Sequence, residues 1–133
     1  MSIRPAWDNA EKTAVRFIYY GQWSWSDMDE AVKEAQHLFD SVKYPVQIIA
    51  DLRESAPIDS HAQIEPVRPF NFVANPDIYI VCVGNQEITH TYFQSVSRIY
   101  RVKQGDARVK FTESLHKARQ IIFQETMSER RYI

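Results

Sequence analysis

The stretch VQIIADLRESAPIDSHA, residues 46–62, holds the two features from which the fold can be predicted. Its first part, residues 46–52, is an apolar run of strand length, which is typical of a strand buried inside a sheet. Its second part carries charged and hydroxyl side chains and a proline, which indicate a loop at the carboxyl end of that strand. A buried strand that ends in a polar turn is common in parallel α/β sheets, where functional loops lie beyond the carboxyl ends of the strands.

The N-terminal segment predicts a β-hairpin. Residues 2–8, SIRPAWD, are short and extended, and Pro5 is tolerated only near the edge of a sheet. The side chains of Asp8 and Asn9 are expected to bond their own backbone and turn the chain. The second strand, residues 13–20, alternates apolar and other residues, and the apolar positions that share one face are Val15, Phe17 and Tyr19.

The clearest helix is expected directly after this hairpin. Apolar residues from Met28 to Val42 recur at intervals of three and four, which places them in one stripe of an α-helix. Ser24 or Ser26 is expected to cap its start, where nearby acidic residues suit the positive end of the helix dipole. Pro45 follows its end.

Further elements follow the stretch at 46–62. Residues 78–83, IYIVCV, are apolar throughout, which indicates a strand covered on both faces. A helix is expected over residues 90–103, with Thr89 as its cap. A short strand at 108–111 precedes a last helix, which Thr112 is expected to cap.

Residues 60–75 should hold another helix if strands and helices alternate throughout. Pro66 and Pro69 each remove a backbone donor, so this helix is expected to be kinked or broken. The sequence therefore predicts a single α/β domain over residues 1–133. Its sheet is expected to be four- to five-stranded, mixed and mostly parallel, with an N-terminal hairpin and about four helices.

Composition narrows the classes of function. The chain has 133 residues, 44% of them apolar and 25% charged, which is typical of a globular domain. Its net charge of −1 predicts no general attraction to nucleic acid or to an anionic membrane. Residues 1–85 carry 7 basic and 12 acidic side chains, whereas residues 86–133 carry 9 and 5. This uneven distribution could steer a charged partner or a second copy, so a homodimer is one expectation.

Cys82 is the only cysteine, so no disulfide within the chain and no cysteine-based metal cage is expected. Its apolar neighbours predict a small buried hydrophobic residue. The N-terminus lacks an apolar signal region, and the apolar runs are far shorter than the roughly 20 residues of a membrane span. We therefore expect a cytoplasmic protein without membrane insertion, metal or cofactor.

Two polar loops are candidates for a functional site. If the sheet is parallel, both lie beyond the carboxyl ends of strands and meet at one rim, where ligands and partners of such folds gather. The first loop supplies Asp51, Arg53, Asp59 and His61, and the second supplies Asn85, Thr89 and His90.

An enzymatic interpretation of this rim is possible but weak. His61 or His90 could act as a base and Ser55 or Ser60 as a nucleophile, with Asp51 as the orienting acid. The sequence contains no recognisable nucleophile-elbow, zincin, Walker or dinucleotide-binding motif. We therefore predict a protein that is not an enzyme.

Trp23 and Trp25 lie at the start of the first predicted helix, after two tyrosines. They form either an aromatic patch for a partner or dimer, or part of the core with at least one ring buried. Basic residues are not interleaved with these rings, so nucleic-acid stacking is not expected there.

The order of elements, together with IIADLRESAPIDSHA, resembles the STAS domain of bacterial anti-sigma-factor antagonists and of sulfate-transporter tails. Asp51-Leu52 and Ile58-Asp59-Ser60 stand at the spacing of the family pattern. The resemblance implies that Ser60 occupies the position of the serine that a partner kinase phosphorylates. The chain departs from the pattern at His61 and Ala62, where the family has a small residue and glycine.

The sequence therefore leads to two hypotheses about function. The first is a regulatory domain that binds another protein, of unidentified kind, and is switched by phosphorylation of Ser60. The alternative is a domain that binds a small ligand, such as a nucleotide or a lipid-like molecule, at the carboxyl rim of the sheet.

Overall fold

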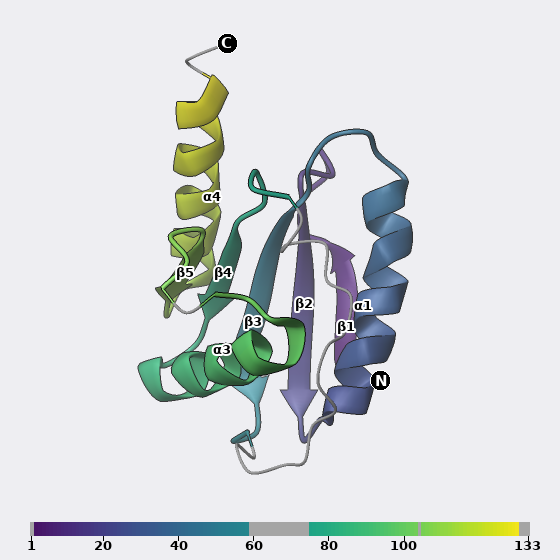
Figure 1. Ribbon diagram of the computed structural model, residues 1–133, viewed down its shortest axis with the longest axis vertical. Coiled ribbons are helices and arrows are strands. Elements are labelled where there is room, and N and C mark those ends of the chain that lie inside the picture. The colour runs from purple at the N-terminus through teal and green to yellow at the C-terminus, as the bar shows by residue number, and fades with distance from the viewer. Residues whose placement is uncertain (1, 59–74, 104, 131–133) are drawn as a thin grey trace.

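A computed structural model describes residues 2–58, 75–103 and 105–130 of the chain. The strands form one five-stranded sheet in the order β1-β2-β3-β4-β5, flanked by helices on both faces (Figure 1). The described elements are β1 (Ile3–Trp7), β2 (Ala14–Gly21), α1 (Trp25–Asp40), β3 (Gln47–Ser55), β4 (Ile80–Val83), α3 (Gln86–Tyr100), β5 (Val109–Thr112) and α4 (Leu115–Arg130).

The pairing of the strands confirms a mixed, mostly parallel sheet. β1 pairs antiparallel with β2, and Ile3 lies opposite Tyr19 in this hairpin. The pairs β2–β3, β3–β4 and β4–β5 are all parallel. The described residues contain three helices instead of the four expected, because the helix expected over 60–75 falls largely outside the described part of the chain.

Alternation along the strands produces two different layers. Val15, Phe17 and Tyr19 share one face as predicted, and they join the larger apolar cluster under α1 and α3 with Ile48 and Cys82. The opposite face is covered by α4 through a smaller cluster of Ala14, Ile49, Val81, Val83, Ala118 and Ile122. The two layers thus use alternate residues of the same strands.

Helix starts agree only partly with the sequence. Ser24 caps α1 as predicted, because its side chain accepts from the backbone N–H of Asp27 and the Asp27 carboxylate accepts in return from the N–H of Ser24. The predicted Thr89 cap is wrong, because α3 begins at Gln86 and Asn85 caps it. At α4 it is Ser114, not Thr112, whose hydroxyl accepts from the N–H of Lys117.

The turn of the hairpin also differs from the prediction. Asn9 closes it by accepting from the N–H of Thr13 at 2.9 Å and donating to the Thr13 hydroxyl at 2.6 Å. The prediction that the Asp8 side chain bonds the local backbone is wrong. Its carboxylate forms ion pairs with Arg16 of β2 and Arg119 of α4 instead.

Candidate functional site

The carboxyl ends of β2, β3, β4 and β5 lie at one edge of the sheet because these strands are parallel. Asn85 comes two residues after the end of β4 and caps α3 at this edge, and His90 lies in the first turns of the helix. The rim expected from the sequence therefore exists for the loop after β4. Asp59 and His61, and the candidate phospho-acceptor Ser60, lie outside the described residues.

Asp51 does not belong to a loop at this rim. β3 continues to Ser55, three residues further than predicted, so Arg53 lies within the strand as Asp51 does. The Asp51 side chain is only 5% exposed, on the face of the sheet that α4 partly covers. The sequence placed Asp51 both near the end of the predicted strand and at an exposed rim. Its place in the strand is confirmed, and its exposure at the rim is wrong.

Two arginines bind the Asp51 carboxylate. Arg53 donates from Nε and Nη2 to its two oxygens, each at 2.8 Å, and Arg16 donates from Nη1 at 3.2 Å. Burial alone would raise the pKa of Asp51, but the Arg53 hydrogen bonds and the two positive charges outweigh it and hold the pKa below its usual range. The carboxylate is therefore ionised at neutral pH, and its lowered pKa makes it a weak base.

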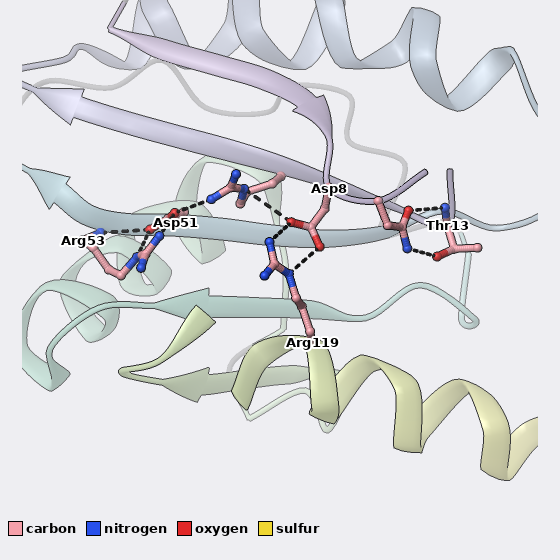
Figure 2. Close-up of polar contacts among 7 residues, drawn as sticks. Asp8, Thr13, Asp51, Arg53 and Arg119 are labelled. Atoms are coloured by element: carbon pink, nitrogen blue, oxygen red, sulfur yellow. Dashed lines mark hydrogen bonds and ion pairs between the residues drawn. The ribbon is translucent and has the colours of Figure 1, made fainter. Parts of the chain in front are cut away.

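A second buried carboxylate extends this network, and Figure 2 shows the contacts. Asp8 is 3% exposed, and Arg119 of α4 donates to its oxygens from Nε and Nη2 at 3.0 and 2.9 Å. Arg16 lies between the two acids, with its Nε 3.5 Å from Asp8, a separation that makes an ion pair but no hydrogen bond. Sequence reasoning missed this network, because Asp8 and Arg119 are separated by 111 positions.

Two of the polar side chains after β4 make hydrogen bonds that stabilise the start of α3. The side-chain oxygen of Asn85 accepts a hydrogen bond from the N–H of Ile88 at 2.9 Å, so this oxygen is already engaged in capping α3. Thr89 is 1% exposed and its hydroxyl donates to the carbonyls of Asn85 and Gln86 within α3. His90 is exposed, and its ring meets Phe111 edge-on at 5.1 Å between centroids.

Two hollows open along the rim. A shallow one of about 200 Å³ lies between the end of β3 and the start of α3, lined by Ser55, Pro57, Ile58, Asn85, Glu87, Ile88 and Thr91. A second one of about 380 Å³ lies between α3 and the end of β5, lined by Gly84, Gln86, Thr89, His90, Phe111, Thr112 and Glu113.

The tryptophans predicted as an aromatic patch lie mainly inside the fold. Trp25 is 9% exposed, and Trp23 is partly buried and donates from Nε1 to the Ser55 hydroxyl at 2.8 Å. Their rings lie 4.8 Å apart, and both pack near Tyr92 of α3. The core interpretation of this pair therefore describes their position better than an exposed patch.

Two buried hydroxyls lie beneath these rings. The hydroxyls of Tyr19 and Tyr92 are 2.5 Å apart, and Tyr19 also donates to the sulfur of Met28 at 3.1 Å. Burial raises the pKa of both tyrosines well above the usual value, so both hydroxyls are neutral. The pair links β2 to α3 in the interior of the fold.

Two further findings concern Cys82 and the acidic and histidine side chains of the described residues. Cys82 is fully buried, and burial raises the pKa of its thiol to about 12, so it is an unreactive packing residue as predicted. Within residues 2–58, 75–103 and 105–130, no three His, Cys, Asp or Glu side chains gather as metal ligands. None of the helices in this part of the chain is long and apolar enough to cross a bilayer.

Comparisons with known proteins find no relative. No protein-family model, no curated protein and no solved structure matches the chain. The resemblance to the STAS domain therefore stays a prediction from the sequence.

Proposed function

We propose that the protein is a non-enzymatic interaction domain whose rim between β3 and α3 contacts a partner protein. The observation that supports this most is the shallow hollow that holds Ile58 and Ile88. At about 200 Å³ it is smaller than the roughly 300–1,000 Å³ of small-molecule sites, whereas a protein surface needs no deep cavity.

The chemistry of the rim also favours binding over catalysis. The carboxylate of Asp51 and the side chain of Asn85 are engaged in structural contacts. What the rim offers is partly buried aliphatic surface at Ile58 and Ile88 beside the exposed Glu87. Apolar surface with a polar border is the usual composition of a protein interface.

Phosphorylation would regulate this contact. In the sequence Ser60 comes two residues after Ile58, and the STAS resemblance implies that it is a phospho-acceptor. A phosphoserine adds nearly two negative charges next to Asp59, which would repel an acidic partner surface. Ser60→Asp is expected to mimic the modified form.

Site-specific photocrosslinking in cells of the native host tests the rim. A photoreactive residue at Glu87 is expected to give a discrete adduct, whereas the same residue at Lys33 on the outer side of α1 is expected to give none. Ser60→Asp should abolish the adduct and Ser60→Ala should keep it. An adduct that survives Ser60→Asp removes the switch, and no adduct from Glu87 removes the interface.

A small ligand at the second hollow is the alternative function. Its volume of about 380 Å³ falls within the range of small-molecule sites, and Phe111, 40% exposed, offers an aromatic face beside His90. A thermal-shift screen with nucleotides and amphipathic metabolites tests this function. A hit that His90→Ala and Phe111→Ser both weaken supports it, and a screen without hits counts against it.

A further inference from the structure

The helices cover the two faces of the sheet unequally. On one face α1 packs on β1 and β2 while α3 packs on β4 and β5, so the full width is covered. On the other face α4 packs chiefly on β3, β4 and β5. Among the described elements no helix lies over β1 and β2 on that side (Figure 1). Two strands span about 10 Å, which is the width of one helix.

This uncovered part, which we call the open face, mixes cationic and apolar side chains. Arg4 and Ile18 lie opposite each other in the β1–β2 pair, and Arg16 and Tyr20 flank Ile18 on the same side of β2. α4 borders the open face with Arg119, whose guanidinium reaches Asp8. Phe123 lies one turn along the same side of α4 and is 64% exposed.

On the open face the carboxylates are buried and the arginine side chains are partly exposed. The carboxylates of Asp8 and Asp51 are nearly fully buried, whereas the side chains of Arg53 and Arg119 are 44% and 48% exposed. Both arginines bind their carboxylate through Nε and Nη2, so the Nη1 groups make no hydrogen bond within the described residues. Within the described residues, the exposed guanidinium groups of Arg53 and Arg119 therefore lie above buried acids, and the exposed side chain of Glu54 lies opposite Tyr20.

We propose that the open face binds an acidic amphipathic helix of a partner protein, which lies beside α4 over β1 and β2. Its carboxylates would accept hydrogen bonds from Arg4, Arg53 and Arg119. Its apolar residues would cover Ile18, Tyr20 and Phe123.

Other occupants fit this surface less well. A second copy would have to offer α1, the acidic helix of this chain, but its exposed residues such as Glu30 and Glu34 are polar and offer nothing to Tyr20 or Phe123. Nucleic acid needs a longer cationic track than a chain of net charge −1 presents here. This inference is separate from the proposed function, because the rim hollows use other residues.

Fluorescence anisotropy with a synthetic peptide tests the proposal. The probe is a labelled helix of about 18 residues, long enough to be partly helical in water, with leucines on one face and glutamates elsewhere. The protein is expected to bind it saturably and more weakly as salt rises. The same peptide with lysine in place of every glutamate should not bind.

Two exposed residues give variants that should fold normally. Arg4 is exposed and makes no side-chain hydrogen bond or ion pair within the described residues, so Arg4→Glu is expected to weaken binding about fivefold. Tyr20→Ser removes an aromatic contact and is expected to weaken it about tenfold. The matched controls are Lys33→Glu on α1 and Phe111→Ser at the rim, where Phe111 is 40% exposed against 39% for Tyr20. Both controls should bind as the wild type does.

Several results would overturn the proposal. Equal binding of both peptides, binding of neither, or wild-type affinity in both Arg4→Glu and Tyr20→Ser would each do so. Tighter binding of a single-stranded oligonucleotide than of the acidic peptide would assign the open face to nucleic acid. A concentration-dependent assembly that Arg4→Glu dissolves would assign it to a second copy. Loss of binding in Phe111→Ser alone would place the contact at the rim.

Discussion

The two faces of the sheet are shielded from water in different ways. The face under α1 and α3 is largely apolar, and the hydroxyl pair of Tyr19 and Tyr92 is buried within it. The other face has a small apolar cluster under α4 and, beside it, the carboxylates of Asp8 and Asp51 with three arginines. A sheet face without full helix cover can thus be closed by ion pairs whose guanidinium ends stay in water.

Neighbouring residues on β2 give the sharpest test of this difference. Phe17 is 1% exposed toward α1 and α3, whereas Ile18 is partly exposed on the open face. Phe17→Ala should lower the free energy of unfolding by about 3–5 kcal/mol, because it leaves a cavity. Ile18→Ala should lower it by about 1 kcal/mol, because the side chain is already partly in water. Urea unfolding measures both, and equal losses would contradict the contrast.

The carboxylate of Asp51 is expected to have the next largest effect. Asp51→Asn removes the charge that Arg16 and Arg53 share and should lower the free energy of unfolding by about 2 kcal/mol. This is below the loss for a fully buried ion pair, because the guanidinium of Arg53 is partly solvated. Glu54→Gln, a nearby exposed site, should change it by less than about 0.5 kcal/mol.

The pH dependence of this variant has a defined sign. Because the pKa of Asp51 is lowered in the folded state, its contribution to stability is complete above the unfolded pKa of about 3.9. It is lost as pH falls through the lower folded pKa. The stability difference between wild type and Asp51→Asn should therefore be constant from about pH 5 to 7 and shrink below about pH 4. A difference that grows in acid would show that Asp51 is not held ionised.

Within the apolar face, the two tyrosines should respond unequally. Tyr19→Phe removes the hydrogen-bonding partner of the buried Tyr92 hydroxyl, which should cost about 1–3 kcal/mol of folding free energy. Tyr92→Phe leaves the Tyr19 hydroxyl its contact with the Met28 sulfur, so about 1 kcal/mol is expected. Thermal and urea unfolding of both variants and the double variant check this order. A larger loss for Tyr92→Phe would contradict the stabilising contact of the Tyr19 hydroxyl with the Met28 sulfur.

The smallest effect is expected at Cys82, whose thiol should react only slowly with a thiol reagent in the native protein. Burial raises the pKa of the thiol to about 12, so the thiolate is rare and shielded at neutral pH. Labelling of the native protein should be at least about a hundredfold slower than in urea, because it requires local opening. Fast labelling without denaturant would show that β4 is less protected than its position in the sheet indicates.

Local patterns explain which parts of the fold could be predicted. Alternation at Val15, Phe17 and Tyr19 identified β2 and its inward face, because side chains alternate along a strand whatever packs on them. The apolar stripe beginning at Met28 identified α1 for the same kind of reason, and Ser24 with Asp27 supplied a local cap. The apolar run at Ile80–Val83 indicated a strand covered on both faces.

Predictions failed where the local sequence was compatible with more than one structure. Asn85 and Thr89 are both acceptable caps, and the end of β4 at Val83 decides between them by starting α3 early. The polar character of Asp51 and Arg53 indicated a loop, but pairing with β2 extends β3 to Ser55. Polar residues can remain in a strand when, as here, they form hydrogen bonds and ion pairs with each other on one face of the strand.

The sequence by itself determined the order along the chain of the described strands and helices, and the inward-facing residues of β2 and α1, because these follow from periods of two and 3.6 residues within short segments. Only the tertiary structure decided that Asp8, Arg16, Asp51 and Arg119 form one network, since the sheet and α4 bring them together from distant positions. It also decided which side of β1 and β2 the described helices leave uncovered. Burial of a charged group depends on where its partner lies in space, and no local pattern carries that information.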